Sequence, residues 1–188
     1  ENLQIIIDEA NRLTTLVNAI LDLSKLQSKT DNDEKEELNV TDLIEQIIKR
    51  NNQLMMHTNC VVKFEFDDEA FIYADQRRLE TIIYNFLSNA IHYCGDDKLV
   101  IVRQIIEEKY VKISFIDHGI GIPKEHIKDI WNRYYKINET HNRKKEGTGL
   151  GLSIIKAALD QYGADYGVES EEGKGSEFWF KLEKIDKK

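Results

Sequence analysis

Two asparagines spaced four residues apart, Asn85 and Asn89, are the residues of this 188-residue chain whose type and spacing first suggest chemistry. Apolar residues recur around them at helical spacing, and positions i and i+4 of a helix share one face. Carboxamide oxygens suit Mg²⁺, a hard cation that keeps several waters and takes its remaining ligands from phosphates. The pair is therefore a candidate metal site, although two solvated asparagines at a helix edge would have the same spacing.

A carboxylate and a glycine turn follow an alternating, strand-like segment at 111–115. Gly119 and Gly121 permit unusual backbone dihedrals, and Asp117 at the strand end can accept a hydrogen bond from an amine such as adenine N6. The turn therefore suggests a site for an adenine base. An ordinary Asp-x-Gly turn is the alternative.

A glycine-rich segment at 146–153 opens another predicted helix. Its glycines, Gly147, Gly149 and Gly151, let the backbone approach a ligand, and the amides and dipole at a helix N-terminus favour phosphate. The preceding residues 142–145 are Asn-Arg-Lys-Lys and not a buried strand, which argues against a Rossmann turn, and the chain has no Walker A loop. The basic run is either a solvated loop or a set of cations that offsets triphosphate charge.

An aromatic and basic segment at 130–135 lies between the turn after Asp117 and the glycine-rich segment. We expect its aromatic side chains to pack on the core. Arg133 could contact a ligand or face solvent, and the sequence leaves both possibilities open.

The spacing of apolar residues predicts the elements that must position these groups. Period-two alternation and apolar content predict strands at 62–66, 98–106, 111–115, 165–170 and 177–180. Helical spacing predicts helices from 39 or 41 to 57, from 75 to 93 and from 148 to 162. Strands and helices without strict βαβ alternation indicate an α+β sandwich with one sheet covered on one face.

The first part of the chain has a different pattern. Apolar residues recur three and four positions apart over residues 1–27, which predicts one helix about 40 Å long that must pack against other helices. Residues 28–37 have almost no apolar content and are typical of a linker. We therefore expect a helical segment at 1–30, a linker at 31–38 and a domain at 39–188, in a piece of a longer protein.

Composition argues against several classes of protein. Lys and Arg number 26 against 34 Asp and Glu, and the resulting net charge of −8 argues against a nucleic-acid partner. No apolar run approaches the roughly 18 residues of a membrane span. Cys60 and Cys94 form no CxxC pair, and we expect both thiols to be structural.

Taken in order, the segments around Asn89 and Asp117 and those at 130–135 and 146–153 resemble the N, G1, F and G2 boxes of the sensor histidine kinases of two-component systems. Residues 172–176 look like the closing glycine turn of that family. The first predicted helix is similar to the second helix of the family's dimerisation and phosphotransfer hairpin. The resemblance implies a two-layer α/β sandwich, shared with gyrase and with the heat-shock chaperone and mismatch-repair ATPases, preceded by one long dimerisation-type helix.

The resemblance also implies roles for individual residues. Asn89 would bind Mg²⁺, and Asn85 would help to hold the water and phosphate shell of the metal. Asp117 would accept a hydrogen bond from adenine, and Tyr93 would line the adenine pocket. The other residues implied to bind ATP are His92, Gly119, Gly121, Arg133, Lys145, Gly147, Thr148, Gly149, Leu150, Gly151 and Leu152.

The implied activity is that of a protein-histidine kinase, which moves the ATP γ-phosphoryl to a histidine and then to an aspartate of a response regulator. The full-length kinase would be a homodimer joined to a membrane by upstream segments, with this part in the cytoplasm. The hairpin helix that carries the accepting histidine is missing, so we expect this chain to bind ATP without phosphorylating itself. His92 stands where the family usually has lysine, which would weaken the contact with phosphate.

Two alternatives accompany this interpretation. A gyrase- or chaperone-type ATPase would hydrolyse ATP to drive conformational change, and it generally activates water with a glutamate one turn before the metal-binding asparagine. This chain has Asn85 there, and an amide cannot take a proton. A scaffold that only dimerises would not need Asn89, Asp117 or the glycines of residues 146–153.

Overall fold

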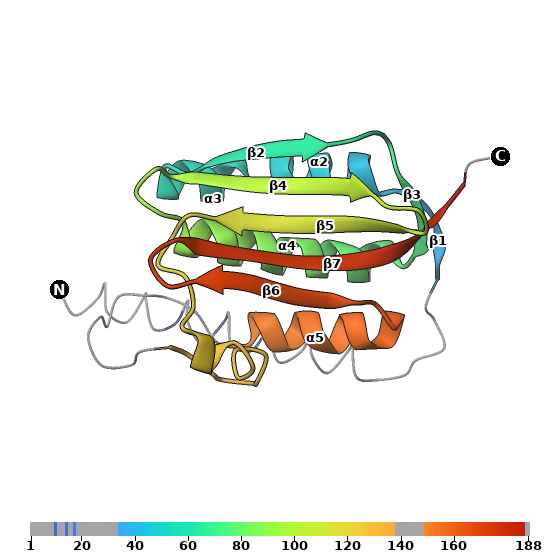
Figure 1. Cartoon of the computed structure of the whole chain (residues 1–188). Coiled ribbons are helices and arrows are strands. Elements are labelled where there is room, and N and C mark those ends of the chain that lie inside the picture. The colour runs from blue at the N-terminus through green and yellow to red at the C-terminus, as the bar shows by residue number, and fades with distance from the viewer. Residues whose placement is uncertain (1–9, 11–13, 15–16, 18–33, 138–148, 187–188) are drawn as a thin grey trace.

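One mixed sheet with helices on one face forms the described part of the chain (Figure 1). The computed structural model describes residues 10, 14, 17, 34–137 and 149–186. Its strands are β1 Glu36–Asn39, β2 Val61–Phe66, β3 Phe71–Ala74, β4 Leu99–Ile106, β5 Tyr110–Asp117, β6 Tyr166–Glu171 and β7 Gly175–Ile185. Their order is β1-β3-β7-β5-β4-β2, with β6 also paired to β7. The pair of β2 and β4 is parallel, and the other pairs are antiparallel.

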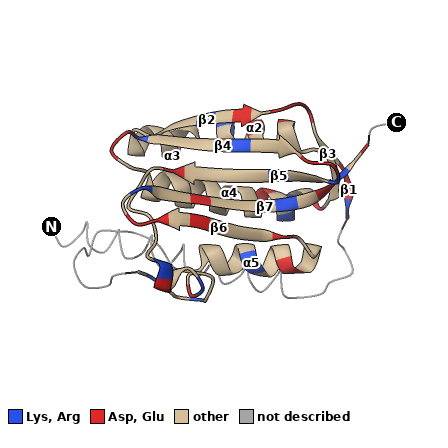
Figure 2. Ribbon diagram, viewed as in Figure 1, with Lys and Arg blue, Asp and Glu red and all other residues tan. Residues whose placement is uncertain are grey.

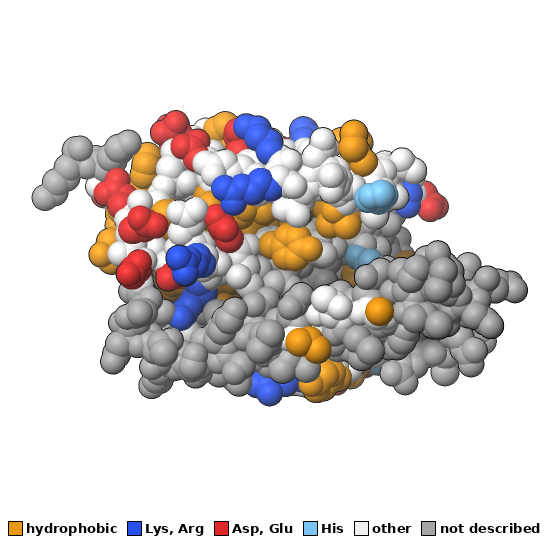
Figure 3. Space-filling view, turned by 180° about the vertical axis from the view of Figure 1, so that it is seen from behind, with side chains coloured by type: hydrophobic (Ala, Val, Ile, Leu, Met, Phe, Trp, Pro, Cys, Tyr) orange, Lys and Arg blue, Asp and Glu red, His pale blue; other side chains and the backbone are white. Residues whose placement is uncertain are grey.

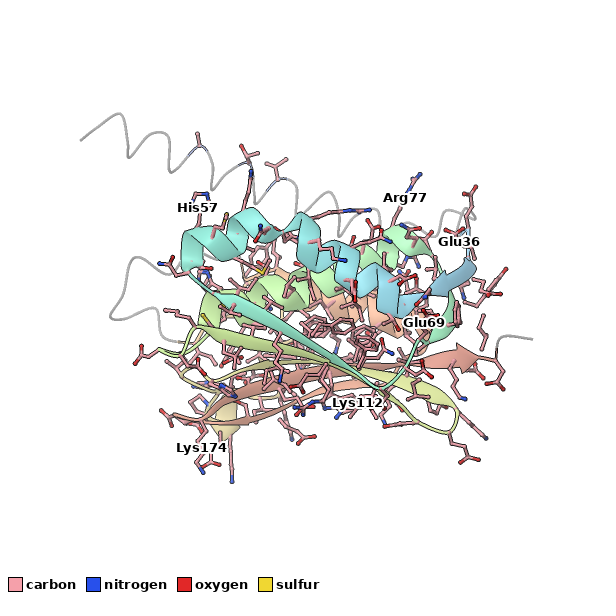
Figure 4. The ribbon with its side chains drawn as sticks, turned by 90° about the horizontal axis from the view of Figure 1, so that it is seen from above. Glu36, His57, Glu69, Arg77, Lys112 and Lys174 are labelled. Atoms are coloured by element: carbon pink, nitrogen blue, oxygen red, sulfur yellow. The ribbon has the colours of Figure 1, made fainter. Side chains whose placement is uncertain are left out.

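The described helices are α2 Val40–Arg50, α3 Asn52–Thr58, α4 Gln76–Tyr93 and α5 Gly151–Tyr162, with a 3₁₀ turn, η1, at Lys124–His126. Helices α2, α4 and α5 lie on the same side of the sheet, so the domain has two layers (Figure 4). The predicted α+β fold with one covered face is therefore confirmed.

The core lies between these two layers. Phe86 of α4 is 1% exposed, and its ring stacks on Phe115 of β5 and Phe180 of β7 at centroid distances of 5.2 and 5.7 Å. The other apolar residues that predicted α4 are also buried: Leu79, Ile82, Ile83, Leu87 and Ala90. Burial of this stripe holds α4 against the sheet and fixes the orientation of its polar edge.

Side-chain caps set the beginning of two helices. Asn39 Oδ1 accepts hydrogen bonds from the backbone N–H groups of Thr41 and Asp42 at 3.1 and 3.2 Å. Asp75 Oδ1 accepts one from the Arg78 N–H at 2.8 Å. Such caps satisfy amides that have no partner inside the helix, and they place the starts of α2 and α4 where the sequence predicts them.

The prediction of a single helix from residue 39 or 41 to 57 is wrong in one respect, because the helix is interrupted at Asn51. The Asn51 side-chain amide donates a hydrogen bond to the Ile47 carbonyl at 2.8 Å. Its backbone N–H donates to the carbonyls of Ile47 and Ile48. Asparagine competes with the helix for backbone groups in this way, and α3 starts as a separate helix.

Helix α5 starts at Gly151. The predicted start at residue 148 lies outside the described residues, but Gly149 and Leu150 are not part of the helix, which corrects the prediction. Gly149 has a φ of 70°, in the left-handed region that glycine tolerates and a right-handed helix does not use.

The five predicted strands are confirmed, but two more are present. Strand β1 pairs with β3 and contains residues 36–38 of the predicted linker, so the linker prediction is wrong for those residues. Both strands have four residues, too few for a period of two to stand out in the sequence. Most of the predicted helix at 1–27 and residues 31–33 of the predicted linker lie outside the described residues, and the division into domains stays a prediction.

Charged side chains of both signs are interleaved over the described strands (Figure 2). On the open face of the sheet, Lys112 pairs with Glu177 at 3.2 Å and Arg103 with Glu65 at 3.0 Å. On the helix-bearing face, most acidic side chains lie toward one end and the histidines toward the other, whereas basic side chains are spread along the face (Figure 3). No helix among the described residues combines the length and apolar character that a membrane span requires.

Candidate functional site

Asn85 and Asn89 lie one turn apart on α4, and both face the first residue of α5. Asn85 Nδ2 donates a hydrogen bond to the Thr81 carbonyl at 2.8 Å. A Cβ atom added at Gly151 would lie 3.3 Å from Asn85 Oδ1 and 3.7 Å from Asn89 Oδ1. The amide oxygens of both asparagines are therefore adjacent to the N-terminus of α5.

The N-terminus of α5 has the chemistry of an anion site. Leu150 occupies the N-cap position, and its buried, apolar side chain cannot accept hydrogen bonds from the amides of the first turn. An anion can take the place of the cap, because these amides and the helix dipole make the N-terminus electropositive. Leu150 thus offers a ligand only its backbone.

The donor set of this site fits the expected cation. Two neutral amide oxygens beside an anion-binding helix end suit Mg²⁺ that is held jointly by protein and phosphate oxygens. Within residues 34–137 and 149–186, no cluster of three His, Cys, Asp or Glu side chains could hold a metal ion. Because Mg²⁺ usually keeps several waters and takes further ligands from phosphates, a cation at Asn85 and Asn89 would share its coordination shell with the bound molecule and with water.

Asp117, the last residue of β5, is 3% exposed. Its Oδ1 accepts a hydrogen bond from the Gly119 N–H at 2.9 Å, and its carboxylate also accepts one from the Ser176 N–H. Burial raises the pKa of Asp117 from 3.8 to about 6, and the two hydrogen bonds oppose the rise. At pH 7 the side chain is mostly ionised and is a buried acceptor, as the recognition of an amine requires.

Close backbone contacts join the turn after β5 to the end of α4. A Cβ atom at Gly119 would lie 1.8 Å from the Tyr93 carbonyl oxygen, and one at Gly95 would lie 2.1 Å from the His118 carbonyl oxygen. His118 Nδ1 and Asp97 Oδ2 are also 2.6 Å apart. The end of α4, the helix that carries the two asparagines, therefore packs directly against the turn that follows Asp117.

His92 and Tyr93 are the last two residues of α4. Their rings meet edge to face with centroids 4.9 Å apart. Burial raises the pKa of the Tyr93 hydroxyl above its ordinary value, although the residue as a whole is 40% exposed. The Tyr93 backbone carbonyl lies against Gly119 in the turn after β5. The contacts of both side chains with a nucleotide stay predictions.

The glycine turn at 172–176 completes the surroundings of Asp117. A Cβ atom at Gly175 would lie 2.0 Å from the Asp117 carbonyl oxygen. On the other turn, Gly121 has a φ of 65°, and a Cβ atom there would lie 2.0 Å from the Glu171 carbonyl oxygen. The two turns therefore pack directly against each other, at positions where any side chain would collide with backbone.

The aromatic segment at 130–135 packs in part on the core. Trp131 meets Tyr166 and Phe178 edge to face, at centroid distances of 5.0 and 6.0 Å. The expected packing of this ring is therefore confirmed. Arg133 is exposed, and its contact with a ligand stays a prediction.

The glycine-rich segment is described only from Gly149 onward. The Gly149 carbonyl accepts a hydrogen bond from the Tyr134 N–H at 2.9 Å, which links the aromatic segment to the start of α5. Three predicted ligands of ATP lie outside the described residues: Lys145, Gly147 and Thr148.

Three partners in the site are not predicted by the sequence: Thr81, Gly95 and Ser176. Thr81 and Ser176 contribute backbone groups, which any residue type has, so their identity carried no signal. Gly95 had a signal, since it is a glycine two residues after the predicted end of a helix, and glycine is common just beyond helix ends.

One family in the comparison with known proteins matches this site. Residues 74–185 match the family described as "Histidine kinase-, DNA gyrase B-, and HSP90-like ATPase". The matched range runs from the end of β3 to the end of β7, so it contains the two asparagines, Asp117 and the start of α5.

Curated relatives match nearly all of the chain. It is 33% identical over 172 residues to the signal transduction histidine-protein kinase ArlS of Staphylococcus haemolyticus, with 91% of this chain and 38% of ArlS covered. It is 32% identical over 177 residues to the sensor histidine kinase WalK of Bacillus subtilis, with 93% and 29% covered. It is 30% identical over 186 residues to the sensor protein SrrB of Staphylococcus aureus, with 98% and 32% covered. The chain thus spans about a third of the length of these relatives.

Solved structures of similar fold include two of the histidine kinase ThkA. Its nucleotide-free catalytic domain has a TM-score of 0.70 at 27% identity, covering 80% of this chain and 96% of that one. Its complex with the response regulator TrrA has a TM-score of 0.77 at 26% identity, covering 98% and 51%. Full-length ShkA in complex with AMPPNP has a TM-score of 0.81 at 22% identity, covering 99% and 39%, a likeness of fold.

Proposed function

The chain belongs to the family of histidine kinase-, DNA gyrase B- and HSP90-like ATPases, and from this premise we propose that it is the ATP-binding catalytic part of a sensor histidine kinase. It binds Mg-ATP and donates the γ-phosphoryl to a histidine of the full-length kinase, for relay to an aspartate of a response regulator. Support comes from two relatives named as histidine kinases, which match 93% and 91% of this chain, and from the sensor protein SrrB, which matches 98%. ThkA, a histidine kinase of similar fold, has been solved together with a response regulator.

The observation that carries the proposal is the position of Gly151 against the amide oxygens of Asn85 and Asn89. It puts neutral oxygen ligands next to helix amides, which is what a cation shared between protein and phosphate needs. Asn89 would bind the metal, and Asn85 would hold its water and phosphate shell. The first amides of α5 would hold the phosphates themselves.

The proposed residues act by position and charge. Asp117 would accept a hydrogen bond from the adenine amine, and Tyr93 would line the base pocket beside it. Bound Mg²⁺ would supply neutralisation of phosphate charge, and the basic run at 143–145 would add to it. No protein nucleophile is required, because phosphoryl transfer depends mainly on alignment and electrostatic stabilisation.

The rest of the proposal concerns the whole kinase. We propose that it is a homodimer whose membrane attachment lies in segments outside this chain, with this part on the cytoplasmic side. Ala10, Thr14 and Val17 are helical, in keeping with a hairpin helix in that region. Thr14 Oγ1 donates to the Ala10 carbonyl at 2.9 Å, a bond of helical spacing.

Hydrolysis of ATP to drive conformational change is the other activity in this family, and the residue one turn before Asn89 argues against it. That position holds Asn85, whose amide nitrogen already donates to the Thr81 carbonyl. An amide cannot take a proton from water, so this side chain cannot act as the general base of a hydrolase.

Binding of a non-hydrolysable ATP analogue is expected to be strengthened by Mg²⁺, and Asn89→Ala is expected to remove that strengthening. Loss of an outer-shell partner of a metal ligand already costs about 10- to 100-fold in metal affinity, so loss of a direct ligand is expected to cost at least as much. Calorimetric titrations of the analogue and of ADP, each with and without Mg²⁺, measure the effect. ADP binding without Mg²⁺ should be nearly unchanged in the variant, because the adenine contacts are intact.

Asn52→Ala is the matched control for this titration. Asn52 is an exposed asparagine at the start of α3, outside the site, so its loss should leave the Mg²⁺ effect as in the unaltered chain. Equal Mg²⁺ effects in the Asn89 and Asn52 variants would contradict the assignment of the metal site. No binding by the unaltered chain would contradict the proposed function as a whole.

The chain alone is expected not to become phosphorylated when it is incubated with γ-labelled ATP and Mg²⁺. The reason is that none of its histidines lies in the setting of an accepting histidine, which is a hairpin helix with an adjacent acidic residue and a following proline. Denaturing gels of the labelled mixture measure the transfer. Stable label on this chain would contradict the prediction and would direct attention to a histidine that the resemblance does not identify.

A further inference from the structure

The chain has two cysteines, Cys60 and Cys94, and neither has a role in the proposed nucleotide site. Both are free thiols. Cys60 lies between α3 and β2 and is 5% exposed, whereas Cys94 is the C-cap residue of α4 and is half-buried. The two are far apart in the sequence, so only the fold can bring them together.

The pairing of β2 with β4 brings the two cysteines into contact. The Val61 N–H, directly after Cys60, donates to the Lys98 carbonyl at 2.7 Å, and the turn before Lys98 is closed by its N–H on the Gly95 carbonyl at 3.1 Å. This turn leads back to Cys94. The Cys94 side chain packs against the core that contains Cys60. The two thiols are close enough to interact, since Cys94 helps to raise the pKa of the Cys60 thiol.

The residues on either side of Cys94 touch the proposed adenine site. Tyr93 precedes it, and the Tyr93 carbonyl oxygen packs so closely on Gly119 that a Cβ atom added there would lie only 1.8 Å away. Gly95 follows it and contacts the His118 carbonyl so closely that a Cβ atom added at Gly95 would lie 2.1 Å from that oxygen. A displacement of the backbone at Cys94 therefore acts on the turn after β5, whose Gly119 N–H donates to Asp117.

We propose that Cys60 and Cys94 form a redox-sensitive dithiol, and that its oxidation to an intramolecular disulfide weakens nucleotide binding. The second part rests on the proposed function, because it takes the site around Asp117 to be the adenine site. A disulfide brings its sulfur atoms to about 2.05 Å, closer than two unbonded thiols can approach. Closing the bond draws the end of α4 toward β2 and pulls Tyr93 away from the glycine turn that it contacts.

The oxidant in this proposal is a low-molecular-weight disulfide, RSSR. The Cys94 thiol, the more exposed of the two, loses its proton and attacks RSSR, which gives a mixed disulfide at Cys94 and releases RS⁻. The Cys60 thiol then loses its proton and attacks the Cys94 sulfur, releasing a second RS⁻. Protonation of both leaving groups gives two RSH, so the two protons and two electrons lost by the protein are recovered in them.

The environment of Cys60 makes the second attack the slower one. Burial, followed by the interaction with Cys94, raises the pKa of the Cys60 thiol to about 12, so little thiolate is present at neutral pH. Disulfide formation should therefore become faster as the pH rises. In some dithiols a stabilised thiolate favours the reduced form over the disulfide. The Cys60 thiolate is not stabilised, so it does not favour the reduced form in this way.

The test compares the 188-residue chain in two redox states. One sample is kept in excess dithiothreitol, and the other is incubated with excess oxidised glutathione and then freed of it. Non-reducing gels and mass spectrometry of peptides identify the link between Cys60 and Cys94 and its loss of two hydrogens. Calorimetric titration with ADP is expected to give an affinity about fivefold or more lower for the oxidised chain, restored by dithiothreitol.

The variants Cys94→Ala and Cys60→Ala are the controls, each checked for folding by its thermal transition. Neither can form the bond, so ADP affinity should be the same after both treatments. Because Cys94 is only half-buried, its variant serves if the buried Cys60 variant is unstable. The inference is overturned if only mixed or intermolecular disulfides form, or if the oxidised chain binds ADP as tightly as the reduced one. Failure of the reduced chain to bind ADP would instead overturn the proposed function, and this inference with it.

Discussion

Replacement of Asp117 by asparagine is expected to abolish measurable ADP binding and, at the same time, to make the protein more stable to heat. One carboxylate oxygen accepts the Gly119 N–H. If asparagine keeps that bond through its oxygen, its other position is an NH₂ group, which donates and would face the donating adenine amine. Removing one partner of a buried charged hydrogen bond costs about 2 to 5 kcal/mol, which is 30-fold or more in affinity.

The gain in thermal stability follows from the pKa of Asp117. Burial raises this pKa from 3.8 to about 6, so keeping the Asp117 carboxylate ionised in the folded protein at pH 7 costs at most about 3 kcal/mol. Asparagine has no such cost, and the melting temperature should rise by about 3 to 6 °C at pH 7. A substitution that removes binding by simply unfolding the site would lower the melting temperature instead.

The pH dependence of this gain has a definite sign. A raised pKa means that the folded protein binds more protons than the unfolded chain between about pH 4 and pH 6, so the stability of the unaltered protein falls as the pH rises through that window. The variant lacks this titration. Its advantage should be full at pH 7 and close to zero at pH 4, as measured by calorimetric scans across the range.

Asp186→Asn is the control for both measurements. The Asp186 side chain is 90% exposed, so neither ADP affinity nor the melting temperature should change appreciably. An Asp117→Asn protein that binds ADP like the unaltered chain would contradict the adenine contact. One that is less stable at pH 7 would contradict the cost of burying the carboxylate.

Gly119→Ala is expected to be strongly destabilising for the addition of a single methyl group. The added Cβ would lie 1.8 Å from the Tyr93 carbonyl oxygen and 2.9 Å from Asp117 Oδ1, so the turn must separate from the end of α4. Overpacking of this kind costs about 1 to 3 kcal/mol. Because backbone has to move here, we expect the upper end of that range, together with loss of ADP binding, measured by urea denaturation and calorimetric titration.

Gly163→Ala separates the collision from the general effect of replacing glycine. Gly163 has a φ of 62°, and a Cβ atom there would meet nothing within 4 Å. That variant should lose only about 1 kcal/mol from backbone strain and should bind ADP normally. If the two variants were equally stable and bound ADP equally well, the contact between Tyr93 and Gly119 would not hold the site together.

Much of the fold follows from local pattern. The apolar period of residues 75–93 predicted the helix that carries both asparagines, and its apolar residues are buried as expected. Where local pattern was weak, prediction failed. Strands β1 and β3 are too short to show a period, and at Asn51 a side-chain hydrogen bond, rather than a change in hydrophobic pattern, ends the helix.

For the site, the sequence by itself determined the kinds of groups present: two amides on one helix face, a carboxylate at a strand end, and glycines at the start of another helix. These features depend on residue type and on spacings of a few residues, which the backbone geometry of a helix or turn converts directly into proximity. The motif resemblance identified the same groups, although it left their contacts open.

Only the tertiary structure decided which of these groups meet. Gly151 reaches Asn85 and Asn89 because α5 packs beside α4, and the Ser176 N–H reaches Asp117 because β7 pairs with β5. The contact of Cys60 with Cys94 arises from the pairing of β2 with β4 in the same way. Such contacts form at distances of a few ångströms between segments that are remote in sequence. They are set by strand register and by close packing of the layers, and neither leaves a signal in the order of neighbouring residues.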